Sequence, residues 1–566
     1  MTPTSTDVGD APSRRPARAA REPRDEGQWA LGSTAPLNPN EVFKAADGGL
    51  NVRERIEQVY AKQGFASIPA DDLRGRMRWW GLYTQRRPGI PGGKTASLPP
   101  EELDDEFFML RIRSDGGALD AAQLRVIAGI ARDFGRGLAD VTDRQNIQLH
   151  WIAIEDVPEI WRRLDDVGLG TTEACGDTPR VVLGSPVAGV AADEVIDGTP
   201  AIEQIVREFV GDPDFANLPR KFKAAVSGSP RQDVAHEIND VSFVGVVHPE
   251  YGPGFDLWVG GGLSTNPMLA QRLGAWVPLD EVAEVYGAVL GLFRDYGYRR
   301  LRAKARLKFL LRDWGPLRFR EVLENEYLRR RLIDGPAPEP AAAGERDHIG
   351  IHPQRDGRVY VGAATTVGRV SADILDAVAD VAEAGGGGRI RLTPWQNLVL
   401  LDIDPQRADQ VAAGLAQVGL RTQPSPLRRS AMACTGIEFC KLAISETKAR
   451  TAALVDTLEA RLPEFDSPIA IHVNGCPNSC ARFQVADIGL KGVLVEDGGA
   501  QVEGFQVHLG GSLGQDAGFG RTPRGLRLAG DEIPDYVERL LRRFQELGDG
   551  RSFAEWAVEA DEEDLR

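Results

Sequence analysis

The chain has 566 residues and a mass of 61.5 kDa, and 42% of its residues are hydrophobic, so it can bury several cores. No apolar stretch is long enough to cross a membrane, and a formal net charge of -16 argues against nucleic acid as a partner. We therefore predict a globular, cytoplasmic protein of several domains.

The N-terminal segment, 1–40, is rich in Pro, Ala, Ser and Arg and lacks hydrophobic periodicity, which predicts a disordered arm. Ordered structure is expected to begin with a helix in which Ile56, Val59 and Tyr60 form an apolar stripe that ends at Gly64. A second flexible stretch, 335–347, has the sequence GPAPEPAAAGERD and predicts a linker between two unequal parts of the chain.

An internal repeat relates these two parts. VTDRQNIQLHWI around Gln145 matches RLTPWQNLVLLDI around Gln396, and the same number of residues then leads to Gly168 and to Gly419 within a Val-Gly-Leu sequence. Each copy begins with a strand (FFMLRIR or RVYVGAA) and an amphipathic helix, so each is expected to run strand, helix, strand, helix. The sequence predicts an α+β protein built from two such halves.

The segment RLRAKARLKFLLRDWG carries apolar residues at helical spacing. In a single helix, Arg302 and Arg306 face the same side, and so do Lys304 and Lys308. Like charges stacked in this way repel, so the segment indicates either an anionic partner or a plain solvated helix face.

Four of the five cysteines form two pairs in the C-terminal quarter, Cys434 with Cys440 and Cys476 with Cys480. Four thiolates suit a 4Fe-4S cluster, which takes one sulfur per iron. Zinc is the main alternative, because the C-x3-C pair has a usual zinc spacing although the C-x5-C pair does not. Disulfides are disfavoured because the cysteine count is odd and nothing suggests export. Pro477 suits the first turn of a helix, whose start is expected to lower the pKa of a neighbouring thiol.

The residues around the cysteines, TGIEFCKLAISETK and NGCPNSCARFQVADIGLKG, resemble the cluster-binding segments of siroheme-dependent sulfite and nitrite reductases. The resemblance runs from about Val52 to the 550s and is strongest to ferredoxin-dependent assimilatory sulfite reductases. It implies two halves that face a siroheme across a pseudo-twofold axis. It also implies a 4Fe-4S cluster on the four paired cysteines, with Cys480 bridging the cluster to the siroheme iron.

The resemblance also implies a domain division. After the arm (1–40) and an N-terminal helical and extended segment (41–100) come a ferredoxin-like half-domain (101–170) and a siroheme-binding α/β domain (171–334). After the linker (335–347) come a second ferredoxin-like half-domain (348–421) and a second domain for cluster and siroheme (422–566).

By the same resemblance, four cations surround the substrate: Arg111, Arg180, Lys221 and Lys223. Arginine offers a permanent fork for oxyanion oxygens, whereas lysine can give up a proton when burial or crowding lowers its pKa. Taken singly, each cation is equally typical of a solvated face. Siroheme carries several carboxylates, and the candidates to bind them are Arg144, Gln145, Lys304 and Arg306.

The Lys-Phe-Lys sequence ending at Lys223 bears on the substrate, because nitrite reductases of this family tend to carry K-x-N there. Sulfite can carry two negative charges and nitrite only one, so the second lysine favours reduction of sulfite to sulfide in sulfate assimilation. Reduction of nitrite to ammonia is the alternative. An iron-sulfur or zinc scaffold, or an electron carrier without a catalytic haem, is the non-enzyme alternative.

Neither Gly-rich piece of the chain, VGGGLS or AGGGGRI, fits the fingerprint of a nicotinamide site. Electrons are therefore expected from a separate protein, ferredoxin by resemblance or otherwise a flavoprotein, and the enzyme itself is expected to be a monomer.

The fifth cysteine, Cys175, lies five residues before Arg180. A lone cysteine is most often a small buried hydrophobe. The alternative is a covalent link to Tyr83 near the distal face of the siroheme, as in some sulfite reductases that this chain resembles.

Overall fold

The structure is a computed structural model that describes residues 38–341, 346–514 and 516–566. These residues form four β-sheets with helices packed on them. The predicted arm, 1–40, lies outside the described residues up to position 37, and its last residues begin helix α1 (Pro39–Ala46), which Asn38 caps. Residues 342–345 of the predicted linker also lie outside. Among the described helices, none combines the length and the apolar character needed to cross a membrane.

The two copies of the repeat have the same order of elements. The first contains β2 (Asp104–Ile112), α6 (Ala121–Phe134), β4 (Leu138–Val141), β5 (Ile147–Ile152) and α7 (Val157–Asp165). The second contains β13 (Val359–Ala363), α11 (Ala372–Ala384), β15 (Arg389–Leu392), β16 (Leu398–Ile403) and α12 (Ala408–Gln417). The predicted elements are present, and each copy has one further strand, β4 or β15, before its Gln-Asn pair. Each added strand is too short to show a periodicity in the sequence.

Each of these two modules gives a short strand to the sheet of the other. β3 (Ala118–Asp120) follows β2 in the chain but pairs with β15, and β14 (Arg369–Ser371) follows β13 but pairs with β4. Helices α6 and α11 pack together, and the apolar residues of both modules form one core. The strand exchange makes the modules a single unit with pseudo-twofold symmetry, which confirms the predicted duplicated α+β architecture.

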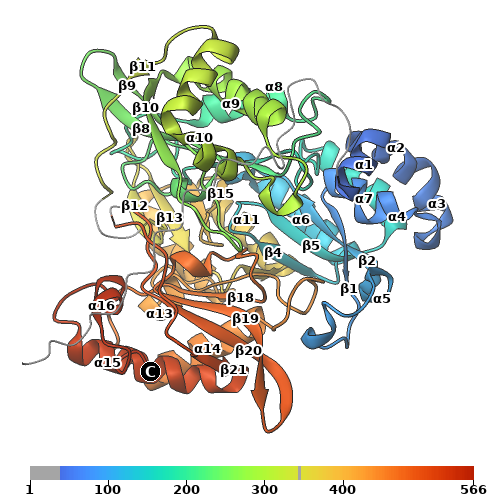
Figure 1. Ribbon diagram of the computed structural model, residues 1–566. Coiled ribbons are helices and arrows are strands. Elements are labelled where there is room, and N and C mark those ends of the chain that lie inside the picture. The colour runs from blue at the N-terminus through green and yellow to red at the C-terminus, as the bar shows by residue number, and fades with distance from the viewer. Residues whose placement is uncertain (1–37, 342–345, 515) are drawn as a thin grey trace, which may run out of the picture.

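Two larger domains flank this unit, and Figure 1 draws them at its upper (green) and lower (orange to red) ends. The first larger domain contains β6 (Pro179–Gly184), α8 (Thr199–Phe209), β7 (Phe222–Ser227), β8 (Val241–His248), β9 (Gly252–Val259), β10 (Gln271–Val277), α9 (Val282–Tyr296), α10 (Leu307–Val322) and β11 (Ile333–Asp334). The second larger domain contains β17 (Met432–Ala433), α14 (Lys448–Arg461), β18 (Ile471–Asn474), β19 (Ile488–Asp497), β20 (Ala500–Leu509), β21 (Arg527–Ala529) and α15 (Ile533–Leu547). The first three strands of each domain run parallel and the rest antiparallel. Since the carboxyl ends of parallel strands meet at one edge, the loops that follow these strands gather there.

The glutamine of each Gln-Asn pair ties its module to the adjoining larger domain. Gln145 donates from Nε2 to the carbonyls of Gly184 (2.9 Å) and Leu392 (2.8 Å), and its Oε1 accepts from the Gly184 N–H (2.9 Å). Gln396 makes the same pair of bonds with Ala433, at 2.9 and 3.1 Å. The carboxamide of Gln145 is thus engaged in the fold, with both of its hydrogens used, and we do not retain it as a siroheme contact.

We expect Gln145→Ala to lower the free energy of unfolding by about 2–4 kcal/mol, because buried backbone groups in two domains lose their partners. A thermal melt followed by circular dichroism measures the effect as a lower Tm. Gln204→Ala removes only an exposed bond to Glu208 (2.9 Å) and should leave the Tm unchanged. Equal Tm values for the two variants would contradict the bridging role of Gln145.

The basic segment at 300–315 is not one helix, because a 3-10 turn ends before α10 begins. Arg302 pairs with Asp177 (Nη2 to Oδ1, 2.9 Å) and Arg306 with Asp240 (Nη2 to Oδ2, 2.8 Å). Lys308 is buried and donates to three backbone carbonyls. The predicted stacking of like charges is therefore wrong, since each of these cations has its own internal partner.

Candidate functional site

The two cysteine pairs lie on loops at one edge of the second larger domain. Cys434 follows β17 and Cys476 follows β18, and these strands are parallel neighbours. The backbone N–H of Gly475 donates to Sγ of Cys434 at 3.2 Å. Hydrogen bonds of this kind stabilise a thiolate that binds metal. The remaining two, Cys440 and Cys480, lie further along the same two loops.

The four thiols are within electrostatic reach of one another. Burial raises the pKa of Cys434 to about 12, and the charge of Cys480 adds to the rise. Burial, followed by the charge of Cys480, also raises the pKa of Cys440 and of Cys476. A positively charged metal centre offsets this cost and keeps all four sulfurs as thiolates.

The described residues contain no group of three or more His, Cys, Asp or Glu side chains placed to bind a single metal ion. A structural zinc ion needs such a group, with thiolate sulfurs at about 2.3 Å from the metal.

The helix expected at Pro477 is not found in this part of the described chain, where turns lead to a 3-10 helix at Phe483–Val485. The predicted lowering of a thiol pKa by a helix start is therefore wrong, and burial raises the pKa of Cys476 instead.

Three of the four predicted substrate cations, Arg111, Lys221 and Lys223, lie within electrostatic reach of Cys480, and Arg180 lies within reach of Lys221. Arg111 is on β2, Arg180 is on β6, and Lys221 and Lys223 stand at the start of the neighbouring strand β7. The charges of Lys223 and Arg180 both act on Lys221, and a thiolate at Cys480 acts on Arg111 and on both lysines. The structure thus brings together residues that come from the first module and from both larger domains.

The two lysines are half-buried among like charges. Burial lowers the pKa of Lys223 to about 7, and the guanidinium of Arg144 contributes to this shift. Burial, with the charge of Lys223, lowers the pKa of Lys221 well below its usual range. Neither ammonium group has a hydrogen-bond or ion-pair partner in the described chain. Two half-buried ammonium groups that form no ion pair with a carboxylate of the described residues indicate a site for an anion.

The arginines are held by the protein around them. Arg111 donates to Sγ of Cys175 (3.0 Å) and to Oε1 of Gln148 (2.6 Å), and Gln148 donates in turn to Oγ1 of Thr435 (3.3 Å). This chain of contacts joins Arg111 to the residue that follows Cys434. Sequence reasoning missed Gln148, and no local pattern marks it, because its role depends on β2 and β5 being paired.

The candidate siroheme cations fall into two groups. Arg144 is half-buried and donates to Oδ1 of Asn239 (2.6 Å). The charges of Arg144 and Arg306 both act on Lys223, so both arginines border the anion site. Lys304 instead lies over the ring of Phe309, with Nζ 4.8 Å from the ring centre. We therefore retain Arg144 and Arg306 as candidates and leave Lys304 out.

Two further arginines belong to the same cationic region. Burial lowers the pKa of Arg220 to about 10, with Arg302 as the next cause, and Arg220 directly precedes Lys221. Arg482, two residues after Cys480, donates from Nη2 to the carbonyls of Asp143 (2.8 Å) and Pro394 (2.7 Å). Their adjacency to predicted site residues is the sequence signal that could have identified them.

The first larger domain contains a counterpart of the cysteine loop. VSGSPRQD (226–233) matches VNGCPNSC (473–480) in its V-x-G-x-P sequence and in following a strand of a parallel set. The match puts Asp233 where the second half has Cys480. This counterpart has no cysteine, so only one half of the duplicated fold can bind a cluster through four thiolates.

Asp233 is instead the centre of a closed polar network. It accepts from the hydroxyls of Ser185 (2.7 Å) and Ser227 (2.8 Å), and its Oδ2 lies 2.6 Å from Nε2 of His348. All four side chains are buried. A network in which every acceptor is engaged stabilises the contact between the domains and leaves no ligand position open.

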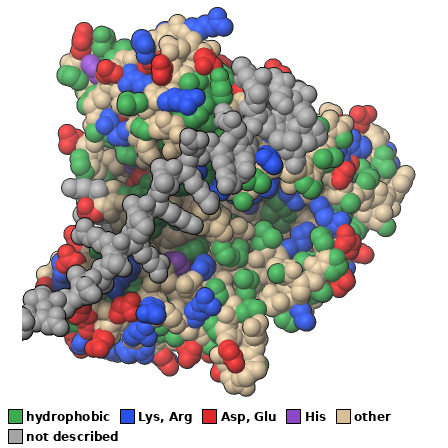
Figure 2. Space-filling view, viewed as in Figure 1, with side chains coloured by type: hydrophobic (Ala, Val, Ile, Leu, Met, Phe, Trp, Pro, Cys, Tyr) green, Lys and Arg blue, Asp and Glu red, His purple; other side chains and the backbone are tan. Residues whose placement is uncertain are grey.

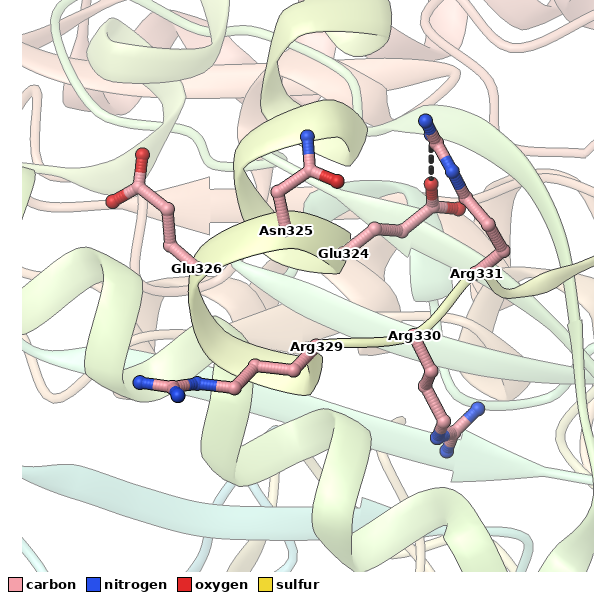
Figure 3. A pocket seen from close by; sticks show the side chains of 6 residues that line it. All are labelled: Glu324, Asn325, Glu326, Arg329, Arg330 and Arg331. Atoms are coloured by element: carbon pink, nitrogen blue, oxygen red, sulfur yellow. Dashed lines mark hydrogen bonds and ion pairs between the residues drawn. The ribbon is translucent and has the colours of Figure 1, made fainter.

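On the face shown in Figure 2, the surface is hollowed between the upper and lower parts of the molecule, and Lys and Arg side chains border the hollow. A cavity of about 610 Å³ elsewhere on the protein is lined by Glu324, Asn325, Glu326, Arg329, Arg330 and Arg331. Figure 3 shows that its lining comes from one helix end and the turn after it, with Glu324 paired to Arg331. Arg330 pairs outside the lining, with Glu281 and Glu284. Since none of the lining residues is among the cations and thiols described above, this cavity is not part of the candidate site.

A duplicated α+β fold with four clustered thiols near half-buried cations that form no ion pair within the described chain defines a redox protein that acts on an anion. The family description "Nitrite and sulphite reductase 4Fe-4S domain" matches residues 175–332 and 426–555. The description "Nitrite/Sulfite reductase ferredoxin-like half domain" matches residues 101–167 and 352–418. The chain belongs to the nitrite and sulfite reductase family.

Relatives match over nearly the whole chain. Sulfite reductase (ferredoxin) 2 of Mycolicibacterium paratuberculosis is 62% identical over 558 residues, which cover 98% of this chain and 99% of the relative. The structure of the Mycobacterium tuberculosis NirA protein matches with a TM-score of 0.94 and 60% identity, over 96% of this chain and 100% of that one. The assimilatory ferredoxin-dependent nitrite reductase of Haloferax mediterranei is 36% identical over 552 residues, covering 92% of this chain and 91% of the relative.

The cofactors of this family are siroheme and a 4Fe-4S cluster, and the described residues fit both. The four cysteines suit the cluster. Three buried donors near them, Nε of Arg111, Nε of Arg144 and Nδ2 of Asn474, have no partner in the described chain. Buried N–H groups without acceptors are costly, and the carboxylates of a siroheme or an oxyanion substrate supply the acceptors.

Proposed function

We propose that this protein reduces sulfite to sulfide in sulfate assimilation, taking electrons from ferredoxin. The observation that carries the proposal is the pair of half-buried ammonium groups, Lys221 and Lys223, which form no ion pair with any described residue and lie within electrostatic reach of Cys480. The names of the relatives that are about 60% identical, sulfite reductase (ferredoxin), support it.

In this proposal the siroheme and the cluster on Cys434, Cys440, Cys476 and Cys480 supply the site of reduction and the electrons. The protein binds, orients and protonates the substrate. Arg111 and Arg180 have fixed positions, so they orient the oxyanion through its oxygens. Lys223, with a pKa of about 7, can donate a proton near neutral pH and recover it from solvent.

The choice of sulfite over nitrite depends on the second lysine. With Arg111, Arg180 and Lys221, Lys223 gives the site a charge better matched to a dianion than to a monoanion. Nitrite reduction is the alternative, because more distant relatives such as that of Haloferax mediterranei are named nitrite reductases.

Ferredoxin as donor, a monomeric state and a cytoplasmic location belong to the same proposal. Leu442, two residues after Cys440, is 60% exposed, so a donor can approach close to the cluster. The Arg-rich arm (1–40) is a further candidate for docking an acidic donor, and it lies outside the described residues up to position 37. Turnover with ferredoxin and with a flavoprotein, each at rising salt, separates the two donors, because docking through basic patches weakens with ionic strength.

Steady-state reduction of sulfite and of nitrite by purified protein tests the function. Sulfite should be the better substrate by kcat/KM, and negligible sulfite turnover would overturn the proposal. Acid extraction of siroheme and the visible spectrum separate the enzyme from a scaffold, since a cluster alone gives a broad brown shoulder and zinc gives no colour.

We also propose that Tyr83 and Cys175 are linked covalently. An ionised Cys175 raises the pKa of Tyr83, after burial, so the two groups are close, and Arg111 contacts the sulfur. Each side chain loses one hydrogen to an oxidant such as dioxygen as the carbon–sulfur bond forms. We expect the intact mass of the wild type to lie two hydrogens below the mass calculated from its sequence. The intact mass of Cys175→Ser should equal the mass calculated for that variant. Peptides with both side chains unmodified would exclude the link.

A further inference from the structure

A second cavity, of about 280 Å³, lies where the first module, the first larger domain and β15 of the second module meet. The first module contributes the backbone around Gly116, and helix α8 contributes Thr199, Ile202 and Val206. The strand β15 contributes Arg391. None of these residues belongs to the site described above.

Arg391 is a buried cation without a partner. It is only 8% exposed, yet it forms no hydrogen bond or ion pair with any residue in the described ranges. Its neighbour on the same face of β15, Arg389, is bound by Asp402 (Nη2 to Oδ1, 2.7 Å). Asp115, on the wall of the cavity, is already bound by Arg113 (2.6 Å). A buried guanidinium is costly unless an anion neutralises it.

The pseudo-twofold symmetry identifies the equivalent of Arg391. Aligning Gln145 with Gln396 in the repeat pairs Asp140 with Arg391, because each lies five residues before the glutamine. The strand position that holds a carboxylate in one half therefore holds a guanidinium in the other.

The helix that faces this strand changes in the same way. Gly184 and Ala433 are equivalent, since each pairs with the glutamine of its half, and α8 and α14 begin the same number of residues later, at Thr199 and Lys448. Lys448 pairs with Asp140 (Nζ to Oδ1, 3.5 Å) and is buried. In one half the strand and helix charges neutralise each other, and in the other the strand charge faces an uncharged Thr199.

The rest of the cavity lining bears on which anion can bind. Helix α8 begins at Thr199, and Oδ1 of Asp197 accepts a hydrogen bond from the backbone N–H of Thr199 (2.9 Å). Ile202 and Val206 add apolar wall next to these polar groups. The rim residues Glu203 and Arg207 carry opposite charges. The carboxylates of Asp197 and Asp402 also lie within electrostatic reach of Arg391, although neither forms an ion pair with it.

We propose that this cavity binds a small organic acid with one carboxylate, which pairs with the guanidinium of Arg391, and a short apolar chain, which lies on Ile202 and Val206. The planar fork of arginine matches a carboxylate in two parallel hydrogen bonds. One guanidinium with carboxylates in its surroundings favours a monoanion over sulfate or phosphate, and the apolar wall favours an organic acid over an inorganic ion.

Calorimetric titration of the full-length holoprotein with 3-methylbutanoate tests the proposal. We expect binding by the wild type and at least a tenfold loss of affinity in Arg391→Gln, since a charge-assisted pair is lost. Arg389→Gln, on the same strand, is the matched control and should bind as the wild type does. Neutral 3-methylbutanamide should not bind.

A second variant keeps the test decisive if Arg391→Gln does not fold. Thr199→Glu places a carboxylate beside Arg391, in an ion pair like that of Lys448 with Asp140 in the other half. This variant should abolish binding and raise the Tm. Three results overturn the proposal: a wild type with no Kd below about 10 mM, binding that survives both variants, or sulfate that binds as tightly as 3-methylbutanoate.

Discussion

Replacement of Cys480 by serine is expected to abolish sulfite reduction, with a loss of at least about a thousandfold in kcat. Cys480 is the exposed member of the four cysteines, and its charge acts both on the other thiols and on the cations of the anion site. It therefore lies between the cluster and the substrate. Serine is a poor ligand for iron, so the variant should lose the cluster and, with it, siroheme. Iron and acid-labile sulfide analysis and siroheme extraction measure the two losses separately.

The control for this variant is Asn478→Ser, which changes an exposed residue of the same loop. It should keep both cofactors and most of the activity. A Cys480→Ser protein that retains siroheme in normal amount would contradict the bridging role, whatever its activity. Circular dichroism of the variant should remain that of a folded protein, because an exposed side chain contributes little to the core.

Lys223→Asn is expected to lower kcat/KM for sulfite by about 10- to 100-fold, because a charge-assisted hydrogen bond to the substrate is worth roughly 1.5–3 kcal/mol. Nitrite should lose less, since it carries one negative charge and needs less compensation. The sulfite-to-nitrite ratio of kcat/KM therefore falls. Steady-state kinetics with both substrates on the same preparation measure that ratio.

Lys304→Asn is the matched control for this prediction. Lys304 lies over Phe309 and not among the converging cations, so its loss removes the same charge from the protein without touching the site. If both variants change the ratio equally, net charge and not position decides the preference. An unchanged ratio in Lys223→Asn would show that the substrate argument is wrong.

The position of Lys223 also bears on pH. Burial lowers its pKa to about 7, so the charged form dominates below that pH and is lost as pH rises through it. In Lys223→Asn, the part of the pH profile that depends on this proton should disappear.

Much of this protein could be predicted from sequence because the signals are local. The cysteine pairs lie within short loops, and their spacing and flanking residues are enough to indicate a cluster. The repeat around Gln145 and Gln396 likewise shows the duplication. The added strands β4 and β15 were not predictable in the same way, and neither was the exchange of β3 and β14, because pairing partners are far apart in the chain.

The sequence by itself determined the family, the duplicated α+β architecture and the residues that can bind iron through sulfur. Only the tertiary structure decided which cations converge. Gln145 and Lys304 looked like cofactor contacts, but one joins two domains and the other covers an aromatic ring. No sequence pattern marks Arg391, yet it is buried without a hydrogen-bond or ion-pair partner among the described residues. The physical reason is that the state of a charge depends on the groups that surround it in space, and in this fold those groups come from distant parts of the chain.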